Sequence, residues 1–205
     1  MSDLEEGGLP QPLKYGMPLN EALDNRRSNR DFVRGELSAG EISQLLWAAQ
    51  GTTSNEGFRT VPSAGATFPI VIHLVARQGV FQYVSDDHTV KKLADEDLRS
   101  KLTKAAFDQW FMSEAELFIV VSGVIAKTSK RYGDRAHRYV AMEAGAATQN
   151  ILLETVSLDF GAVAVGSFED DEVNRVIKQT KESTPFSIVA VGKKKITGPT
   201  KARHR

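Results

Sequence analysis

Residues 135–157 read RAHRYVAMEAGAATQNILLETVS, a stretch in which apolar residues recur every three or four positions. The residues that share one face of the expected helix are Val140, Ala144, Ala147, Ile151 and Leu152. Alanine and glycine between them allow a neighbouring backbone to approach closely. The stretch therefore predicts a long central helix packed against a second helix.

A second helix is predicted after residue 38. Ser38 followed by Glu41 forms a capping box, in which each side chain satisfies a backbone N–H of the first turn. Gly51 is a stop signal, and the apolar face consists of Ile42, Leu45, Leu46 and Ala49. Shorter helices are expected from Pro18 towards Arg26, over 95–106 and over 170–178.

Two apolar runs, 70–75 and 80–84, flank Arg77-Gln78-Gly79 and predict an antiparallel hairpin. Residues 117–122 and 186–191 predict buried strands, and 161–168 a strand or an extended loop. His73 lies within the first run, where we expect a hydrogen-bonded core histidine rather than a catalytic one. The order of elements predicts an α+β fold with a mixed or largely antiparallel sheet.

The 205 residues, with 26 Lys+Arg, 26 Asp+Glu and no cysteine, are typical of a globular protein. The absence of cysteine excludes disulfides, thiolate metal sites and cysteine nucleophiles. No apolar run approaches the roughly 20 residues that span a bilayer, so a cytoplasmic location is expected, and zero net charge argues against a nucleic-acid-binding domain. We expect an N-terminal arm (1–17), one domain (18–192) and a basic tail (193–205).

Arg26-Arg27-Ser28-x-Arg30 groups three guanidiniums and a hydroxyl that suit a phosphate, although a solvated basic helix end explains the spacing somewhat better. Two further segments have small residues that would let the backbone approach a flat ligand: Pro62-Ser63-Ala64-Gly65 and residues 161–168. Alternatively, the first is an ordinary surface turn and the second an ordinary strand edge. No metal-ligand spacing, dinucleotide fingerprint or serine-hydrolase motif is present. Tyr132 and Tyr139 could position a substrate, donate a proton or serve a structural role.

These segments occur in an order that resembles the FMN-dependent nitroreductase family, and most closely its branch with the peptide-azoline (thiazole/oxazole) dehydrogenases. The matching blocks cover the chain from about Pro18 to Gly192. They are RRSNRDF at 26–32, LS at 37–38, LWAAQG at 46–51, VPSAGA at 61–66, YVAMEAG at 139–145, QN at 149–150 and VGSFEDD at 165–171.

The resemblance implies a sandwich with helices on both sides of the sheet, a homodimer formed through the long central helices, and two FMN sites at the subunit interface. It implies phosphate contacts from Arg26 and Ser28, with Arg27 beside them, and places Arg30 at the pyrimidine side of the ring. The other implied ring or phosphate contacts are Pro62, Ser63 and Ala64 of the other subunit, Gln109, Val165, Gly166, Ser167, Lys201 and Arg203.

The implied activity is hydride transfer from NAD(P)H to the flavin and then to a small acceptor, such as a nitroaromatic or quinone. A fixed cation such as Arg30 would stabilise the reduced ring, and no catalytic side chain is required. The alternatives are a flavin-dependent dehydrogenase of a heterocycle or peptide, a flavin-binding protein without turnover, and an anion- or nucleic-acid-binding module that uses the basic tail. The dehydrogenase branch has an adjacent Lys-Tyr pair, where this chain has Lys130-Arg131-Tyr132.

Overall fold

An antiparallel sheet forms the centre of the structure, a computed structural model that describes residues 4–179 and 182–195. Within these residues the strand order is β1-β5-β4-β3-β6-β8-β2, and β7 also pairs with β8. Every pair of these strands is antiparallel, and one parallel bridge among the described residues joins Ser28 to Ala162. The strands are β1 (Gly7–Gly8), β2 (Phe32–Val33), β3 (Ile70–Ala76), β4 (Gly79–Val84), β5 (Thr89–Ala94), β6 (Leu117–Gly123), β7 (Gly161–Val165) and β8 (Thr184–Lys194).

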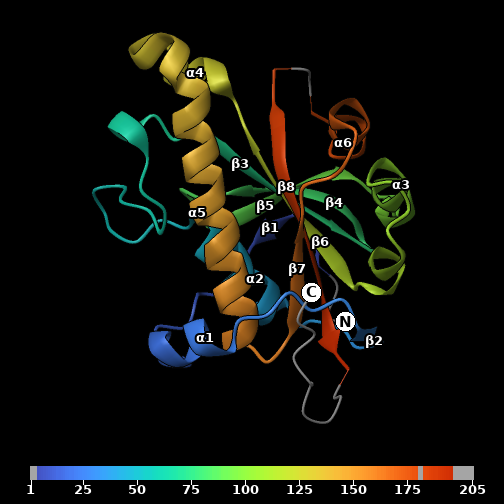
Figure 1. Ribbon diagram of the computed structural model, residues 1–205. Helices are drawn as coiled ribbons and strands as arrows, with labels where there is room; N and C mark the ends of the chain where they lie inside the picture. The colour runs from blue at the N-terminus through green and yellow to red at the C-terminus, as the bar shows by residue number, and fades with distance from the viewer. Residues whose placement is uncertain (1–3, 180–181, 196–205) are drawn as a thin grey trace.

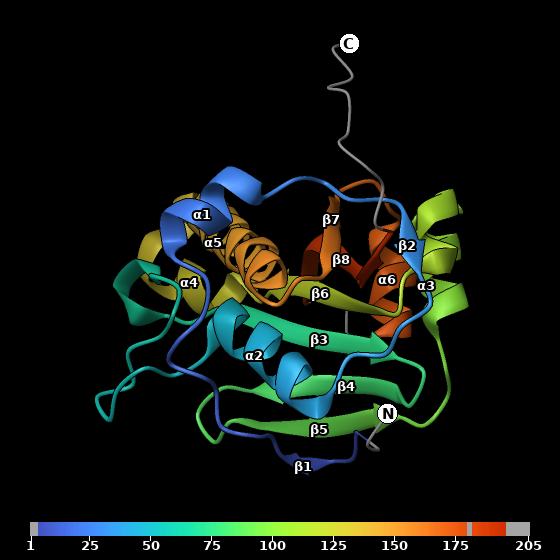
Figure 2. The same ribbon diagram turned by 90° about the horizontal axis from the view of Figure 1, so that it is seen from below.

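Helices cover both faces of this sheet (Figures 1 and 2). The layer built on α5 also contains α1, α2 and α4, whereas α3 and α6 pack against the opposite face. The predicted α+β sandwich is therefore confirmed. The helices are α1 (Leu19–Asn25), α2 (Ala39–Gln50), α3 (Arg99–Ala105), α4 (Ile125–Tyr132), α5 (Ala136–Ser157) and α6 (Asp170–Val176), with short 3₁₀ turns η1 (Ala64–Ala66), η2 (Trp110–Glu114) and η3 (Gly133–Arg135).

The strands supply one residue in two to each helical layer, because successive side chains of a strand point to opposite faces. In β6, Leu117 and Ile119 pack with α2 and α5, while Phe118 and Val120 pack with α3 and α6. Each of these four side chains is at most 1% exposed. The near-continuous apolar run that predicted a buried strand thus serves two cores.

His73 on β3 is fully buried, as expected, but the expectation of a hydrogen-bonded histidine is wrong. Neither ring nitrogen has a partner among the described residues. The strand alternation points His73 to the same face as Val75, which packs in the apolar layer of α3 and α6. Burial lowers the pKa of His73 to about 4, so the ring is neutral near neutral pH.

The central helix α5 runs as predicted and packs against α2. Its buried face carries Val140, Ala144, Ala147 and Ile151 at helical spacing. Helix α2 begins with the predicted capping box, in which Glu41 N–H donates to Ser38 Oγ and Ser38 N–H donates to Glu41 Oε2.

Two local predictions need correction. Helix α3 begins at Arg99 rather than at residue 95, because Asp97 Oδ1 accepts the Arg99 N–H and holds the preceding residues in a turn. Strand β5 was not predicted, since Lys91 and Lys92 interrupt the apolar alternation that marks a strand.

The N-terminal segment from residue 4 packs onto the domain. β1 pairs with β5, Ser43 Oγ donates to the Pro10 carbonyl, and Met17 N–H donates to Ser157 Oγ. At the other end, β8 continues to Lys194, where it pairs with Phe32 of β2. In the part of the chain described here, no helix combines the length and apolarity needed to cross a membrane.

Candidate functional site

The basic segment Arg26–Arg30 lies directly after α1 and is fixed to the start of β7. Arg26 N–H closes the helix by donating to the Ala22 carbonyl at 2.9 Å. Ser28 then forms the parallel bridge to Ala162, and Asn29 N–H donates to the Ala162 carbonyl at 2.9 Å. The guanidiniums are therefore presented from backbone that is held at a strand edge.

The arginines of this segment lie in different surroundings. The Arg27 Nη1 donates to the carbonyls of Asp24 and Arg26, at 2.6 and 2.9 Å, and so caps the end of α1. The Arg30 guanidinium lies 5.5 Å from the centre of the Phe111 ring, in a cation–π arrangement. Arg30 is thereby aimed at η2.

The chain leaves β7 through Val165, Gly166 and Ser167. Val165 is buried, whereas Gly166 and Ser167 are exposed, and a Cβ added to Gly166 would meet no heavy atom within 4 Å. Gln109 Nε2 donates to the Ser167 carbonyl at 3.3 Å and to the Ala106 carbonyl at 3.0 Å. The structure thus brings Gln109 to the 165–167 loop, although 58 residues separate Gln109 from Ser167.

A hollow of about 510 Å³ lies beside the basic segment, between the end of α5, the start of β7 and the end of β8. Its rim carries Arg27, Lys194 and Lys195, and Asn29 lines its wall. The Asn29 Oδ1 is buried and has no partner among the described residues. Asp159 also lines the hollow and is ion-paired with Lys194, so three cations face one carboxylate and the hollow keeps a net positive charge. The Asn29 acceptor suits a ligand hydroxyl and the net positive charge suits an anionic group, so the residues present fit a ligand that carries both, such as the ribityl phosphate of FMN.

The Pro62–Ala64 segment lies elsewhere in the chain's own fold. Arg131 Nη1, at the end of α4, donates to the Gly65 carbonyl at 3.3 Å, and α4 leads into the start of α5. Met17 N–H, just before α1, donates instead to Ser157 Oγ at the other end of α5. Figure 1 shows α1 at one end of α5 and the loop that follows α2 beside its middle. One chain therefore keeps its two groups of predicted ligand residues apart.

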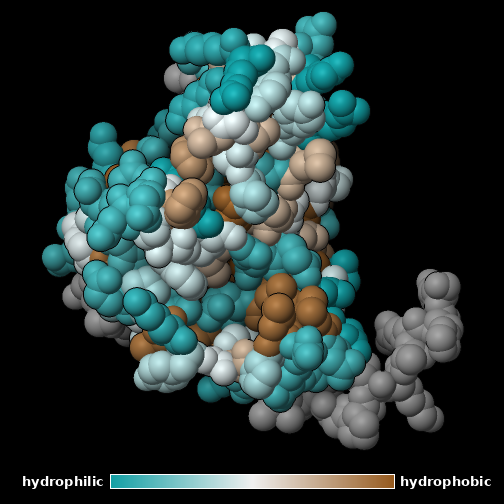
Figure 3. All heavy atoms as spheres, turned by 90° about the vertical axis from the view of Figure 1, so that its left-hand side faces the viewer, coloured by the Kyte–Doolittle hydropathy of each residue, from teal (hydrophilic) through white to brown (hydrophobic). Residues whose placement is uncertain are grey.

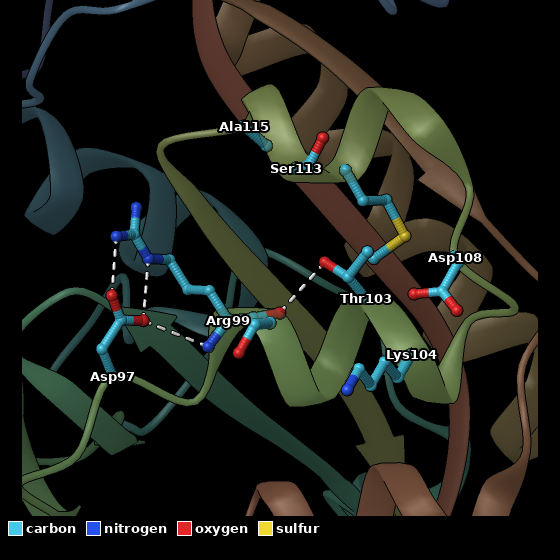
Figure 4. Close-up of a pocket in the computed structure, with 9 residues that line it drawn as sticks. Asp97, Arg99, Thr103, Lys104, Asp108, Ser113 and Ala115 are labelled. Atoms are coloured by element: carbon cyan, nitrogen blue, oxygen red, sulfur yellow. Dashed lines mark hydrogen bonds and ion pairs between the residues drawn. The ribbon is translucent and has the colours of Figure 1, made fainter.

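A second hollow, of about 420 Å³, opens between α3 and η2 (Figure 4). None of the predicted site residues that the structure describes lines it. The charges of Asp97 and Arg99 in this hollow already neutralise each other, because Arg99 Nε donates to Asp97 Oδ1 at 2.9 Å and Arg99 Nη2 donates to Asp97 Oδ2 at 2.7 Å. We therefore locate the candidate site along β7, from the basic segment and hollow at its start to the 165–167 loop at its end.

Two of the predicted site residues, Lys201 and Arg203, lie outside the described residues. Among the described residues, no group of three or more histidine or acidic side chains is arranged to hold a metal ion.

Sequence reasoning missed four residues that shape the candidate site. Asn29 and Phe111 stand beside predicted residues, and their spacing carries no separate signal. Gln50 and Glu143 are buried polar positions on helix faces that are mainly apolar, and that mismatch could have marked them.

Comparisons with known proteins agree with this geometry. Residues 23–193 match the profile described as the nitroreductase family. A candidate nitroreductase of Methanocaldococcus jannaschii, MJ1384, is 38% identical over 200 residues, which cover 95% of this chain and 99% of the relative.

Solved structures share the fold. A candidate nitroreductase from Ralstonia eutropha has a TM-score of 0.84 and 27% identity, over 92% of this chain and 89% of that one. A chain of the Escherichia coli microcin synthetase McbBCD complex, with truncated pro-MccB17 bound, has a TM-score of 0.72 and 19% identity, over 94% and 77%. The NADPH:FMN oxidoreductase of Vibrio harveyi, in complex with NAD⁺, has a TM-score of 0.66 and 16% identity, over 90% and 72%. The last two likenesses concern the fold alone.

The antiparallel sheet between two helical layers, with an open backbone loop after β7, is the architecture of a class of flavin oxidoreductases. The chain belongs to the nitroreductase family. The resemblance read from the sequence is thereby confirmed, and the chain also shares its fold with a chain of the microcin synthetase complex.

Proposed function

We propose that the protein is an FMN-dependent NAD(P)H oxidoreductase that acts as a homodimer. The observation that carries the proposal is the open Gly166 backbone, which lies in a loop held by Gln109 and follows the strand whose start anchors the Arg26–Arg30 segment. Bound FMN would take a hydride from NAD(P)H and pass the electrons to a small acceptor such as a nitroaromatic or quinone.

The chain's own residues would bind and orient this cofactor. Arg26 and Ser28 would hold the phosphate, together with Lys201 and Arg203, and Arg27 would flank it. Arg30 would place a cation at the pyrimidine side of the ring, where negative charge develops on reduction. The backbone of Val165–Ser167 would hydrogen-bond the ring, with Gln109 as a further polar contact.

The homodimer follows from the separation of the ligand groups along α5. Pro62, Ser63 and Ala64 would border the flavin that is held by the partner chain. The side of the molecule that carries α5 shows apolar patches among polar side chains (Figure 3). Met142 of α5 is 67% exposed and Leu19 of α1 is 63% exposed, which suits a surface covered by a second copy.

The test is an absorbance spectrum of the purified protein, followed by anaerobic addition of NADH or NADPH. We expect a yellow protein whose flavin band bleaches with one of the two. Arg26→Ala should weaken FMN binding by roughly 10- to 150-fold, since a charge-assisted hydrogen bond contributes about 1.5–3 kcal/mol. Unchanged FMN affinity in this variant would refute the phosphate assignment.

Other outcomes would favour the alternatives. A yellow protein that reacts with neither nucleotide would indicate a flavin-binding protein without turnover. A colourless protein with salt-dependent affinity for nucleic acid, lost on removal of residues 193–205, would indicate the basic-tail module.

A second candidate function is a flavin-dependent dehydrogenase of a heterocycle or peptide. The supporting observation is that the side chains of Arg131 and Tyr132 lie against Gly65, which directly follows the Pro62–Ala64 segment proposed to border the flavin. The Arg131 guanidinium donates to the Gly65 carbonyl at 3.3 Å, and the Tyr132 hydroxyl would lie 2.6 Å from a Cβ added to Gly65. Oxygen consumption on addition of azoline peptides, lost in Tyr132→Phe, would favour this activity over reduction by NAD(P)H.

A further inference from the structure

Basic side chains gather where α4 passes through η3 into α5. Residues 127–138 carry five Lys or Arg and a single acid, Asp134, although the whole chain has no net charge. Among the described residues, no acid forms an ion pair with any of these five cations. The region therefore holds a local excess of positive charge, which favours an anionic ligand.

Two tyrosine rings order the guanidiniums of this region. The rings of Tyr132 and Tyr139 meet edge to face, with their centres 5.1 Å apart. The guanidinium carbon of Arg131 lies 5.5 Å from the centre of the Tyr132 ring, and that of Arg138 lies 5.7 Å from the centre of the Tyr139 ring. Each ring of the pair thus carries one guanidinium in a cation–π arrangement. We call these four residues the arginine–tyrosine cluster.

The arginine–tyrosine cluster contacts the loop proposed to border the flavin. Arg131 Nη1 donates to the carbonyl of Gly65, which follows the Pro62–Ala64 segment. Arg138 lies one helical turn before Met142, whose exposed side chain is proposed to be covered by the second copy. Figure 1 shows α4 beside the first turns of α5. The cluster therefore lies beside both the flavin loop and the proposed subunit interface.

A nicotinamide dinucleotide has the features that such a cluster recognises. Its adenine is a flat ring that stacks on tyrosine and guanidinium planes, and its phosphates accept hydrogen bonds from arginine. NADPH differs from NADH by a 2′-phosphate, and a phosphate monoester carries a charge of about −1.5 to −2 near pH 7. Arginine is the residue that accommodates this 2′-phosphate in dinucleotide sites of other folds. A nitroaromatic or quinone acceptor has no phosphate, so the cluster favours the nucleotide.

We propose that the arginine–tyrosine cluster binds the adenosine 2′-phosphate end of the electron donor, and that the donor is NADPH rather than NADH. The inference rests on the proposed function, because it requires a flavin beside the Pro62–Ala64 segment. Arg138 is assigned to the 2′-phosphate, since the Arg131 guanidinium is already hydrogen-bonded to Gly65. The exposed Arg135 adds to the attraction from η3.

Steady-state kinetics of the FMN-loaded protein test the assignment of Arg138. Arg138→Ala should lower kcat/KM for NADPH by at least about tenfold and that for NADH by less than about threefold, because only NADPH carries the group that loses its contact. Arg138→Lys retains the charge and should lose less of the preference for NADPH. Lys91→Ala is the matched control, because it removes an exposed cation from β5, and it should change neither value.

Binding without turnover provides a second measurement. Adenosine 2′,5′-bisphosphate carries the 2′-phosphate and 5′-AMP lacks it, and each is titrated into the FMN-loaded protein in a calorimeter. We expect the bisphosphate to bind at least about tenfold more tightly, and Arg138→Ala to remove this difference. Arg135→Ala should reduce the difference as well, and it replaces Arg138→Ala if that variant does not fold or dimerise.

The outcomes separate this inference from the proposed function. If the unmodified protein binds no FMN, the proposed function falls and the inference falls with it. If the flavin bleaches equally well with NADH and NADPH, the proposed function stands and the inference alone is overturned. Equal affinity for the bisphosphate and 5′-AMP would also overturn it, as would a preference that both Arg138→Ala and Arg135→Ala leave unchanged. Displacement of the bisphosphate by an equal concentration of inorganic phosphate would indicate a nonspecific anion surface and would overturn it too.

Discussion

A single methyl group at Gly166 tests whether the loop after β7 touches the cofactor. A Cβ at this position meets no heavy atom within 4 Å, and the backbone is not in the left-handed region, so Gly166→Ala fits the folded apoprotein. Because alanine restricts the unfolded chain more than glycine does, we expect the free energy of unfolding to stay the same or to rise by up to about 1 kcal/mol. The substitution thus separates ligand contact from fold stability.

The cost should appear in FMN binding. A methyl group between the loop and the ring would disrupt one or two backbone hydrogen bonds, each contributing about 0.5–1.5 kcal/mol. A total of about 0.5–3 kcal/mol corresponds to a dissociation constant roughly 2- to 150-fold larger.

The assay pairs urea denaturation of the apoprotein with FMN titration. Gly8→Ala is the matched control, because Gly8 is also open and without left-handed backbone but lies in β1, away from the candidate site. Unchanged FMN affinity in Gly166→Ala would refute the placement of this loop. An apoprotein destabilised by more than about 1 kcal/mol would refute the reading of open space around it.

Three further predictions concern the fold and assembly. Burial lowers the pKa of His73 from 6.5 to about 4, so between these pH values the unfolded chain binds more protons than the folded protein. The free energy of unfolding should therefore fall by about 2 kcal/mol between pH 7 and pH 4.5. Urea denaturation of His73→Leu at the two pH values should show this part of the loss removed. Ser38→Ala should lower the free energy of unfolding by about 1 kcal/mol, because it removes the capping box of α2; a loss below 0.3 kcal/mol or so in urea denaturation would contradict this. Met142→Glu should shift the protein from dimer to monomer in sedimentation velocity, whereas Phe107→Glu, on the opposite layer, should not; an intact dimer in Met142→Glu would exclude this part of α5 from the interface.

Sequence periodicity predicted the long elements well, for physical reasons. α5 and α2 bury one face each, so their apolar residues recur at helical spacing, and the capping box of α2 is a local signal that needs no tertiary contact. β5 escaped notice because it lies near the sheet edge, where Lys91 is exposed and only Val90 is fully buried. His73 was placed in the core correctly, but whether a buried ring finds a partner depends on residues far away in the chain.

The candidate site was predicted as separate pieces rather than as an arrangement. The basic run at 26–30 and the glycine loop at 165–167 each had an ordinary explanation from local sequence. What joins them is the bridge from Ser28 to Ala162 and the contact from Gln109 to Ser167, both of which arise from long-range pairing. Only the resemblance to a family could anticipate that pairing, since residue spacing carries no information about it.

The distance along α5 between Ser63 and the basic segment has a genetic consequence under the proposed assembly. In the proposed dimer each flavin pocket contains residues from both chains. When chains with different substitutions exchange partners, the two substitutions can therefore fall in the same pocket of the new dimer. A mixture of Arg26→Ala and Ser63→Ala chains would produce hybrid pairs with one pocket free of lesions and one that carries both. Two inactive preparations would then recover part of their cofactor on mixing.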